Sequence, residues 1–312
     1  MLRLLVKQPK QTLSVGQVGV EIACRVPRLA HECEQAMDEI SIQIAGSAAV
    51  AAAVTAAHGC KSRLSCQLAD DFLAHHVRAA LTASGIDVRC RTMDGASLSP
   101  LWFSAVEERG DRAAYHTPGD VDLLTADGID PEQLLAGVDA VLVDGTCPSA
   151  QVALADAASR KGIPVVFDGN QIHEGLGTLV GLSDVLICSE RLATELAPRD
   201  DLPSSLTEIQ RLGPKAVIIT LGGAGAIGLH GDELVQQTAY PVDVVSANGA
   251  GAVFHGAFVA ALLAELPFET CMAYASAAAA LSCRTLGVFA GIPARDEVIA
   301  LVRSHADGAA QS

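Results

Sequence analysis

Short apolar runs alternate with helical patterns along most of this chain. Four runs rich in Val, Ile and Leu have the length of buried strands: 138–145, 163–169, 183–189 and 215–220. A shorter run at 12–15 is also predicted to be a strand, and 47–58 and 71–85 are predicted to be helices. Continuous apolar strands joined by helices are typical of a parallel sheet covered on both faces. The pattern therefore predicts an α/β fold with a doubly wound, mostly parallel sheet between helices.

Two segments break this rhythm. Residues 18–27 and 97–117 read as extended strands with no helix inside either segment, and the second carries a turn at 109–111. We expect a small antiparallel β lid that projects from one α/β domain covering 1–312, and this lid could serve as a dimer surface. An irregular excursion without a role is the alternative. Residues 307–312 are expected to form a frayed tail.

Composition excludes several classes of protein. The chain has 312 residues, of which 50% are hydrophobic and 18% charged, and this is too apolar for a disordered chain. The formal net charge of −15 argues against a nucleic acid or an anionic membrane as partner, because both attract clustered Lys and Arg. An anionic small ligand stays compatible with this charge, since backbone N–H groups can hold phosphate locally.

The cysteines and apolar runs predict a cytoplasmic protein. Nine cysteines occur without a Cys-x-x-Cys pair, as expected of a reduced protein. The opening residues MLRLLV are too short for the core of a signal peptide. No run reaches the roughly 18 apolar residues of a membrane span. The Ala-rich runs 45–57 and 273–281 are expected to be buried helices.

Residues 223–228 have the spacing G-x-G-x-x-G directly after a predicted strand. A dinucleotide fingerprint needs a helix that begins at these glycines. The residues that follow read instead as a hairpin turning at 231–232, so we reject a dinucleotide site here.

The segment 242–266 predicts a short strand, a turn with Gly249 and Gly251, and a long apolar helix. Glycines at the start of a helix let several backbone N–H groups converge, and the helix dipole adds positive potential there. Gly249, Ala250 and Gly251 therefore form a candidate anion hole for a phosphoryl group. A tight turn without a ligand is the alternative.

These residues resemble the C-terminal signature of the PfkB (ribokinase-like) carbohydrate kinases, in which a Gly-Ala-Gly turn opens a long helix. The resemblance extends along nearly the whole chain. It includes 15–30 and 45–59, the helical unit 69–88, the Thr-x-Gly-x-x-Gly loop at 220–225, and the helix and loop at 273–293.

The resemblance implies transfer of a phosphoryl group from ATP, with Mg²⁺, to a sugar or a similar alcohol. It places substrate-binding positions at Gly16, Glu21, Gly46 and Val50. It places nucleotide-side positions at Ser189, Thr220, Gly222, Gly225 and Asn248.

The chain departs from the family pattern at the residues that carry chemistry. Ala252 occupies the position of the catalytic Asp, which takes the proton from the attacking hydroxyl. Ser246 and Ala247 replace an Asp and a Thr, Glu21 replaces an Asp, and Val50 replaces an Asn. The N-x-x-E motif, which helps to hold Mg²⁺ and phosphate, aligns with 189–192 and keeps neither of its residue types.

The departures leave two hypotheses open. One is a sugar kinase that is weak or altered, in which His255 is a candidate substitute base, although a locally bonded helix histidine is the plainer interpretation. The other is a non-catalytic protein that binds a sugar or a nucleotide. Glu21, one methylene longer than Asp, could still bond a ligand hydroxyl under either hypothesis.

Overall fold

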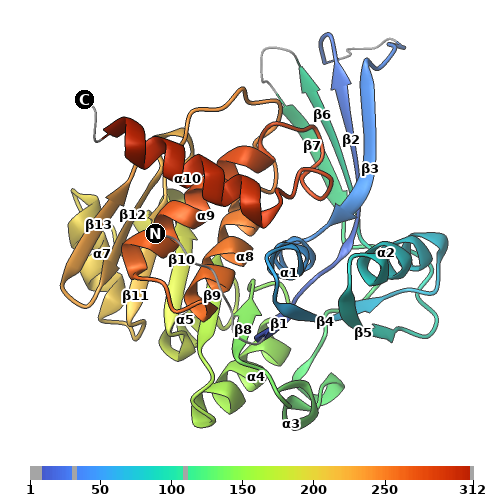
Figure 1. The fold of residues 1–312 in the computed structure, drawn as a ribbon. Helices are drawn as coiled ribbons and strands as arrows, with labels where there is room; N and C mark the ends of the chain where they lie inside the picture. Colours follow the sequence, from blue (N-terminus) through green and yellow to red (C-terminus); the bar gives the residue numbers. More distant parts are fainter. Residues whose placement is uncertain (1–8, 30–33, 108–111, 310–312) are drawn as a thin grey trace.

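The computed structural model describes residues 9–29, 34–107 and 112–309 (Figure 1). A nine-stranded sheet of order β13-β12-β11-β10-β9-β8-β1-β4-β5 forms the centre of the molecule. Its parallel strands are β1 (Gln11–Val15), β4 (Lys61–Leu68), β5 (Ile86–Thr92), β8 (Ala140–Val143), β9 (Val165–Gly169), β10 (Val185–Ser189) and β11 (Ala216–Thr220). The predicted parallel α/β sheet is confirmed. Sequence reading missed β4 and β5, which alternate polar and apolar residues near the sheet edge.

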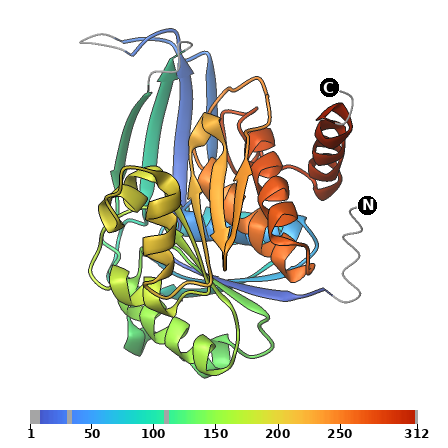
Figure 2. The same ribbon diagram turned by 90° about the vertical axis from the view of Figure 1, so that its left-hand side faces the viewer.

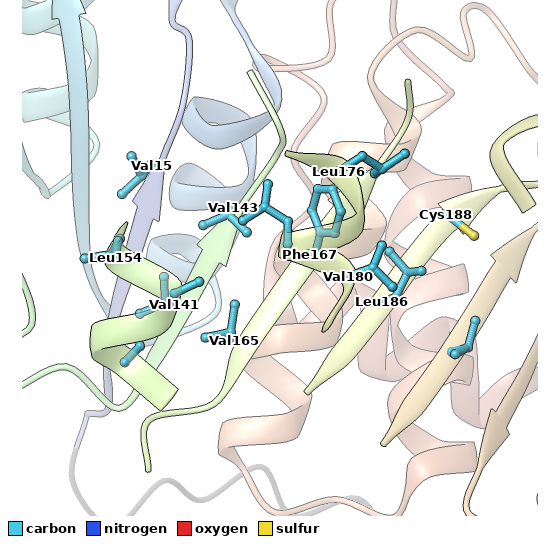
Figure 3. Packing of buried hydrophobic residues seen from close by; sticks show 14 of the residues in the cluster. Val15, Val141, Val143, Leu154, Val165, Phe167, Leu176, Val180, Leu186 and Cys188 are labelled. Carbon is cyan, nitrogen blue, oxygen red and sulfur yellow. The ribbon is translucent and has the colours of Figure 1, made fainter. Parts of the chain in front are cut away.

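Helices cover both faces of this sheet (Figure 2). One face carries α1 (Ser47–Ala57), α2 (Phe72–Ala83), α8 (Ala250–Leu263), α9 (Phe268–Ser282) and α10 (Arg295–Ala309). The other carries α3 (Pro131–Leu134), α4 (Pro148–Arg160), α5 (Leu176–Leu182), α6 (Glu190–Leu196) and α7 (Leu202–Gln210), with single 3₁₀ turns at Ala126–Gly128 and Gly222–Ala224 elsewhere in the chain. Successive strand side chains point to opposite faces and enter one core or the other, which explains the continuous apolar runs. Figure 3 shows part of the second core, where Phe167 packs among Val, Leu and Cys side chains.

A second sheet projects from the main body and forms the expected lid (Figure 1). Its order is β3-β2-β6-β7, with β2 at Gly19–Val26, β3 at Glu39–Ala45, β6 at Leu101–Glu107 and β7 at Arg112–Thr117. The two outer pairs are antiparallel as predicted, whereas β2 and β6 are parallel, because the chain returns to the main sheet between them. Sequence reading missed β3, and the turn predicted at 109–111 lies outside the described residues.

The glycine-rich segment 223–228 leads into a hairpin and not into the helix of a dinucleotide site. β12 (Ala226–His230) pairs with β13 (Glu233–Gln237), and the turn falls at 231–232 as predicted.

The prediction of a short strand before Gly249 is wrong. Residues 241–244 have no regular structure, and the backbone N–H groups of Val245 and Ser246 donate to the carbonyl of Cys283 at the end of α9.

The C-terminal helix, the cysteines and the lengths of the helices bear on three further predictions. α10 continues to Ala309 within the stretch expected to fray, and 310–312 lie outside the described residues. Eight cysteines fall in the described part of the chain, and all are free. Among the helices that the structure describes, none is long and apolar enough to cross a membrane.

Candidate functional site

A cavity of about 530 Å³ lies between the lid and the carboxyl ends of the central strands. Gln17, Thr146 and Asn170 reach it from the segments that follow β1, β8 and β9. Ligands of open α/β sheets bind at this edge, where strand order reverses. Among the described lining residues, Glu21 is the one carboxylate, and Lys and Arg are absent.

The structure brings half of the sequence-predicted site residues to this cavity. Its lining contains Glu21, Gly46, Val50, Asn248, Gly249, Gly251 and Ala252. The other positions lie outside the lining: Gly16, Ala250, His255, Ser189, Thr220, Gly222 and Gly225.

The turn before α8 presents backbone donors to the cavity. Gly249 adopts φ 77°, and a Cβ there would lie 2.7 Å from Val288 Cγ2, so the turn requires glycine. The first N–H groups of a helix have no partner within it, and the dipole makes this end positive. The N–H of Ala250 donates to Ala247 at 3.3 Å, while Gly251 and Ala252 face the cavity. The anion hole expected at 249–251 stays a prediction, with which this helix start is compatible.

The side chain at position 252 is a buried methyl group at the cavity wall. No carboxylate therefore stands where the resemblance places the catalytic Asp. Ser246 keeps a structural function, because its Oγ accepts a hydrogen bond of 3.3 Å from the N–H of Asn248.

Glu21 is buried, and its carboxylate accepts hydrogen bonds from three side chains. Asn248 Nδ2 and Ser104 Oγ donate to Oε1 at 2.6 and 2.9 Å, and Gln43 Nε2 donates to Oε2 at 3.0 Å. Gln43 also accepts a bond of 2.8 Å from the backbone N–H of Phe289. This network joins three lid strands to the anion-hole turn and to the loop after α9.

Asp144, at the end of β8, explains the glycine at position 16. A Cβ on Gly16 would lie 2.2 Å from Asp144 Oδ2. The carboxylate accepts hydrogen bonds from Thr146, Gln151 and the N–H of Ala48 in the first turn of α1. Burial raises the pKa of Asp144, although these bonds act in the opposite direction. Gly16 thus lets a buried carboxylate cap α1 beneath the cavity.

His255 and Asp168 form a buried pair behind the anion hole. His255 Nδ1 lies 2.5 Å from the carbonyl of Gly251, and Nε2 lies 3.3 Å from Asp168 Oδ1 and 3.1 Å from the carbonyl of Ile187. Both ring nitrogens therefore face oxygen acceptors inside the protein and not the cavity. Burial raises the pKa of Asp168 to about 6, while the neighbouring imidazole acts in the opposite direction.

The nucleotide-side positions gather at the ends of β10 and β11. Ser189 and Thr220 are direct neighbours across these strands. Ser189 Oγ accepts the N–H of Leu192 and caps α6, and Thr220 Oγ1 donates to the carbonyl of Cys188 at 3.3 Å. Gly225, at φ 102°, closes against the carbonyl of Gln237 in the hairpin. The hydroxyl groups of Ser189 and Thr220 thus already have hydrogen-bond partners at the strand ends, and Gly225 is needed for the close approach of the hairpin backbone.

The N-x-x-E motif positions, Ser189 and Leu192, offer no carboxylate ligand for Mg²⁺. Leu192, at the Glu position of the motif, is fully buried in the core against Gly169. Across the described residues, no group of three or more His, Cys, Asp or Glu side chains could hold a metal ion. Magnesium prefers oxygen ligands, and the motif positions supply none of the carboxylate type.

Sequence reading missed several cavity residues: Gln17, Trp102, His116, Thr146, Asn170 and Gln171. The positions of Thr146 and Asn170 just after predicted strands were a usable signal, because strand ends meet at one edge of a parallel sheet. No local pattern distinguishes Trp102 or His116, since only pairing within the lid decides which face they occupy.

Comparison with known proteins gives consistent matches. The family model described as pfkB family carbohydrate kinase matches residues 10–295. The 2-dehydro-3-deoxygalactonokinase of Haloferax volcanii is 26% identical, over 85% of this chain and 89% of that relative. The ribokinase of Haemophilus influenzae is 24% identical, over 93% and 98%. The crystal structure of ribokinase from Thermotoga maritima shares the fold with a TM-score of 0.80, covering 95% of this chain and 99% of that one at 24% identity.

Proposed function

Because this chain belongs to the pfkB family of carbohydrate kinases, we propose that it binds a sugar or a similar alcohol in the cavity and phosphorylates it slowly from ATP. The observation that carries this proposal is the cavity wall at the start of α8. α8 begins there after the Gly249 turn, which supports an anion hole of backbone donors, while position 252 carries a methyl group.

The residues divide the work as follows. The N–H groups of Gly251 and Ala252 stabilise charge on the transferring phosphoryl group. Phosphoryl transfer passes through a loose transition state, so positioning and charge stabilisation supply most of the catalysis. Because no residue at 252 accepts the alcohol proton, the reaction loses the contribution of a general base, about 10²- to 10⁴-fold.

In this proposal ATP would be held by the exposed loop at 222–224 and by the backbone donors at the start of α8, and it would supply the phosphoryl group when bound. The residues do not fit a resident Mg²⁺, because the N-x-x-E position is the buried Leu192.

The test is the variant Ala252→Asp, assayed for ADP production with a panel of sugars and nucleosides. We expect the rate to rise by about 10²- to 10⁴-fold, because the new carboxylate stands at the cavity wall. Ala264→Asp adds the same charge at the other end of α8 and serves as the control. No turnover in either the wild type or Ala252→Asp, with both proteins folded, would overturn the proposal.

The second candidate function is binding without catalysis. Three protein donors occupy the Glu21 carboxylate, and Leu192 replaces a motif Glu in the core. These changes lie in different elements, so restoring one base would leave such a protein inactive. Ligand binding without turnover in Ala252→Asp favours this candidate.

We also propose that two copies associate through the outer face of the lid. Ile42, Ile22, Phe103 and Tyr115 form one row across its four strands by register. Three of these side chains are exposed, Tyr115 by 68%. A contiguous apolar sheet face of this kind is typical of a protein interface.

We further propose a cytoplasmic location, since the free cysteines of the described residues support a reducing compartment.

A further inference from the structure

The inner face of the lid carries an aromatic surface above the cavity. Trp102 on β6 and His116 on β7 are direct cross-strand neighbours. Their rings lie nearly parallel, at 19° with centroids 6.1 Å apart, and both line the cavity. A Cβ on Gly19 would lie 2.0 Å from the carbonyl oxygen of Pro100 and 2.8 Å from Trp102 Cζ3, so glycine there admits both the neighbouring backbone and the indole ring. Flat rings on one wall favour a ligand with a planar face.

The charge of the cavity disfavours an anionic ligand. No Lys or Arg belongs to its described lining, and the one carboxylate, Glu21, is held beside Trp102 by strand register. A phosphate or carboxylate on the ligand would meet this negative charge without a cation to offset it. We therefore expect the acceptor alcohol to be uncharged, because the backbone donors at the start of α8 are assigned to the transferred phosphoryl group and no cation of the described lining is left for a second anion.

The remaining wall offers hydrogen bonds without charge. Gln17, Asn170 and Gln171 line it with carboxamides, which can both donate and accept, although the Asn170 amide already donates to Asp168. The Thr146 hydroxyl is bonded to Asp144 and to the N–H of Gln17. The Glu21 carboxylate already accepts three donors, so ligand hydroxyls and ring edges depend mainly on these amides. The cavity volume of about 530 Å³ suits a ligand larger than a single sugar ring.

We propose that the alcohol bound here is a nucleoside, with its base stacked on Trp102 and His116 and its sugar hydroxyls directed toward the turn at 249–252. The inference rests on the proposed function of the cavity as the alcohol site. A free sugar would leave the aromatic surface uncovered, and a phosphorylated sugar would lack a cationic partner.

Trp102 is the only tryptophan of the chain, so intrinsic fluorescence reports directly on this cavity. The wild type is titrated with inosine, ribose, ribose 5-phosphate and gluconate, with ADP present so that binding at the nucleotide side is not counted. We expect inosine to quench the fluorescence with a Kd at least tenfold below that of ribose, and the two anions to leave it unchanged. Equal or tighter binding of ribose or of either anion overturns the inference, as does failure of inosine to bind.

Two variants test the stacking surface. His116→Ala keeps the fluorescent reporter, and Trp102→Leu is measured by calorimetry. Each is expected to weaken inosine binding by about 5- to 150-fold, the usual effect of removing an aromatic stacking partner, and to leave ribose binding unchanged. Phe72→Ala removes an exposed ring on α2 and is the matched control, without effect on inosine. Unchanged inosine affinity in His116→Ala and Trp102→Leu overturns the stacking.

The two proposals fail separately. Inosine binding without phosphorylation leaves the nucleoside assignment standing and removes the kinase activity. Phosphorylation of ribose with no inosine binding leaves the kinase activity and overturns the nucleoside assignment.

Discussion

Asp168 is a buried carboxylate whose pKa depends strongly on its surroundings. It lies at the end of β9, is 2% exposed, and faces His255 from α8 and Asn170 from the following turn. Ser47 from α1 also bonds to it, and Asp144 on β8 acts on it through charge. Burial raises its pKa from 3.8 to about 6. A single side chain thus joins the two helices that begin beneath the cavity.

This raised pKa makes stability depend on pH in a defined direction. Between about pH 4 and 6 the folded chain holds a proton at Asp168 that the unfolded chain has released. Wild type therefore loses stability relative to Asp168→Asn as the pH rises through this window, by about 1 to 3 kcal/mol. Urea unfolding of both proteins from pH 4 to 8 measures the difference.

Asp120→Asn is the control for this measurement. Backbone N–H groups of Ser97 and Leu98 lower the pKa of Asp120 to about 2, so the stability that its carboxylate contributes is constant above about pH 4 and is lost only as the pH falls below this value. A pH-independent difference between Asp168→Asn and wild type would contradict the assignment.

Among the elements, the pair β4 and β5 places two cysteines side by side near the sheet edge. Cys66 and Cys90 are direct neighbours across these parallel strands. The hydrogen bond from Cys66 and the guanidinium of Arg78, 3.4 Å from Sγ, lower the pKa of Cys90 to about 7, although burial acts in the opposite direction. Cys60, also partly exposed, differs because burial raises its pKa to about 11.

Cys90 is therefore expected to be the most reactive of the described thiols. Iodoacetamide at pH 7.5 should alkylate it at least about ten times faster than Cys60, because the thiolate is the nucleophile. Peptide mass mapping over time measures both rates. Arg78→Gln should slow the alkylation of Cys90 and leave Cys60 unchanged. Similar rates at the two thiols would refute the assignment.

At the scale of the whole molecule, the lid has two faces with different chemistry. Its inner face carries Glu21, Ser104 and Trp102 toward the cavity. By strand register the apolar row of Ile42, Ile22, Phe103 and Tyr115 belongs to the opposite face, although Phe103 and Tyr115 also reach the cavity edge. Because side chains alternate along a strand, one sheet can close a ligand site and meet a second copy at once.

The proposed dimer follows from the outer face. Light scattering after size exclusion should give twice the chain mass for the wild type, and Ile42→Lys should give a monomer, because a charge replaces an exposed apolar side chain at the β3 end of the row. Leu212→Lys changes a comparably exposed apolar residue outside the lid and should stay dimeric. A monomeric wild type at micromolar concentration counts against the interface.

The placement of strands was largely predictable because it depends on local pattern. The runs at 138–145 and 215–220 correspond to β8 and β11, and the turn at 231–232 is where the hairpin bends. The strands β3, β4 and β5 were missed, since they mix polar and apolar residues and acquire their pairing from neighbours distant in sequence.

The sequence by itself determined the parallel α/β fold and the glycine turn at the start of α8, and it places Ala252 where the family resemblance predicts a catalytic Asp. These depend on periodicity and on residue type at one position. Only the tertiary structure decided that Glu21 is held by Asn248, 227 residues away, and that Trp102 and His116 face the cavity. Such facts depend on pairing between segments remote in the chain, and local sequence carries no record of which side chains will meet.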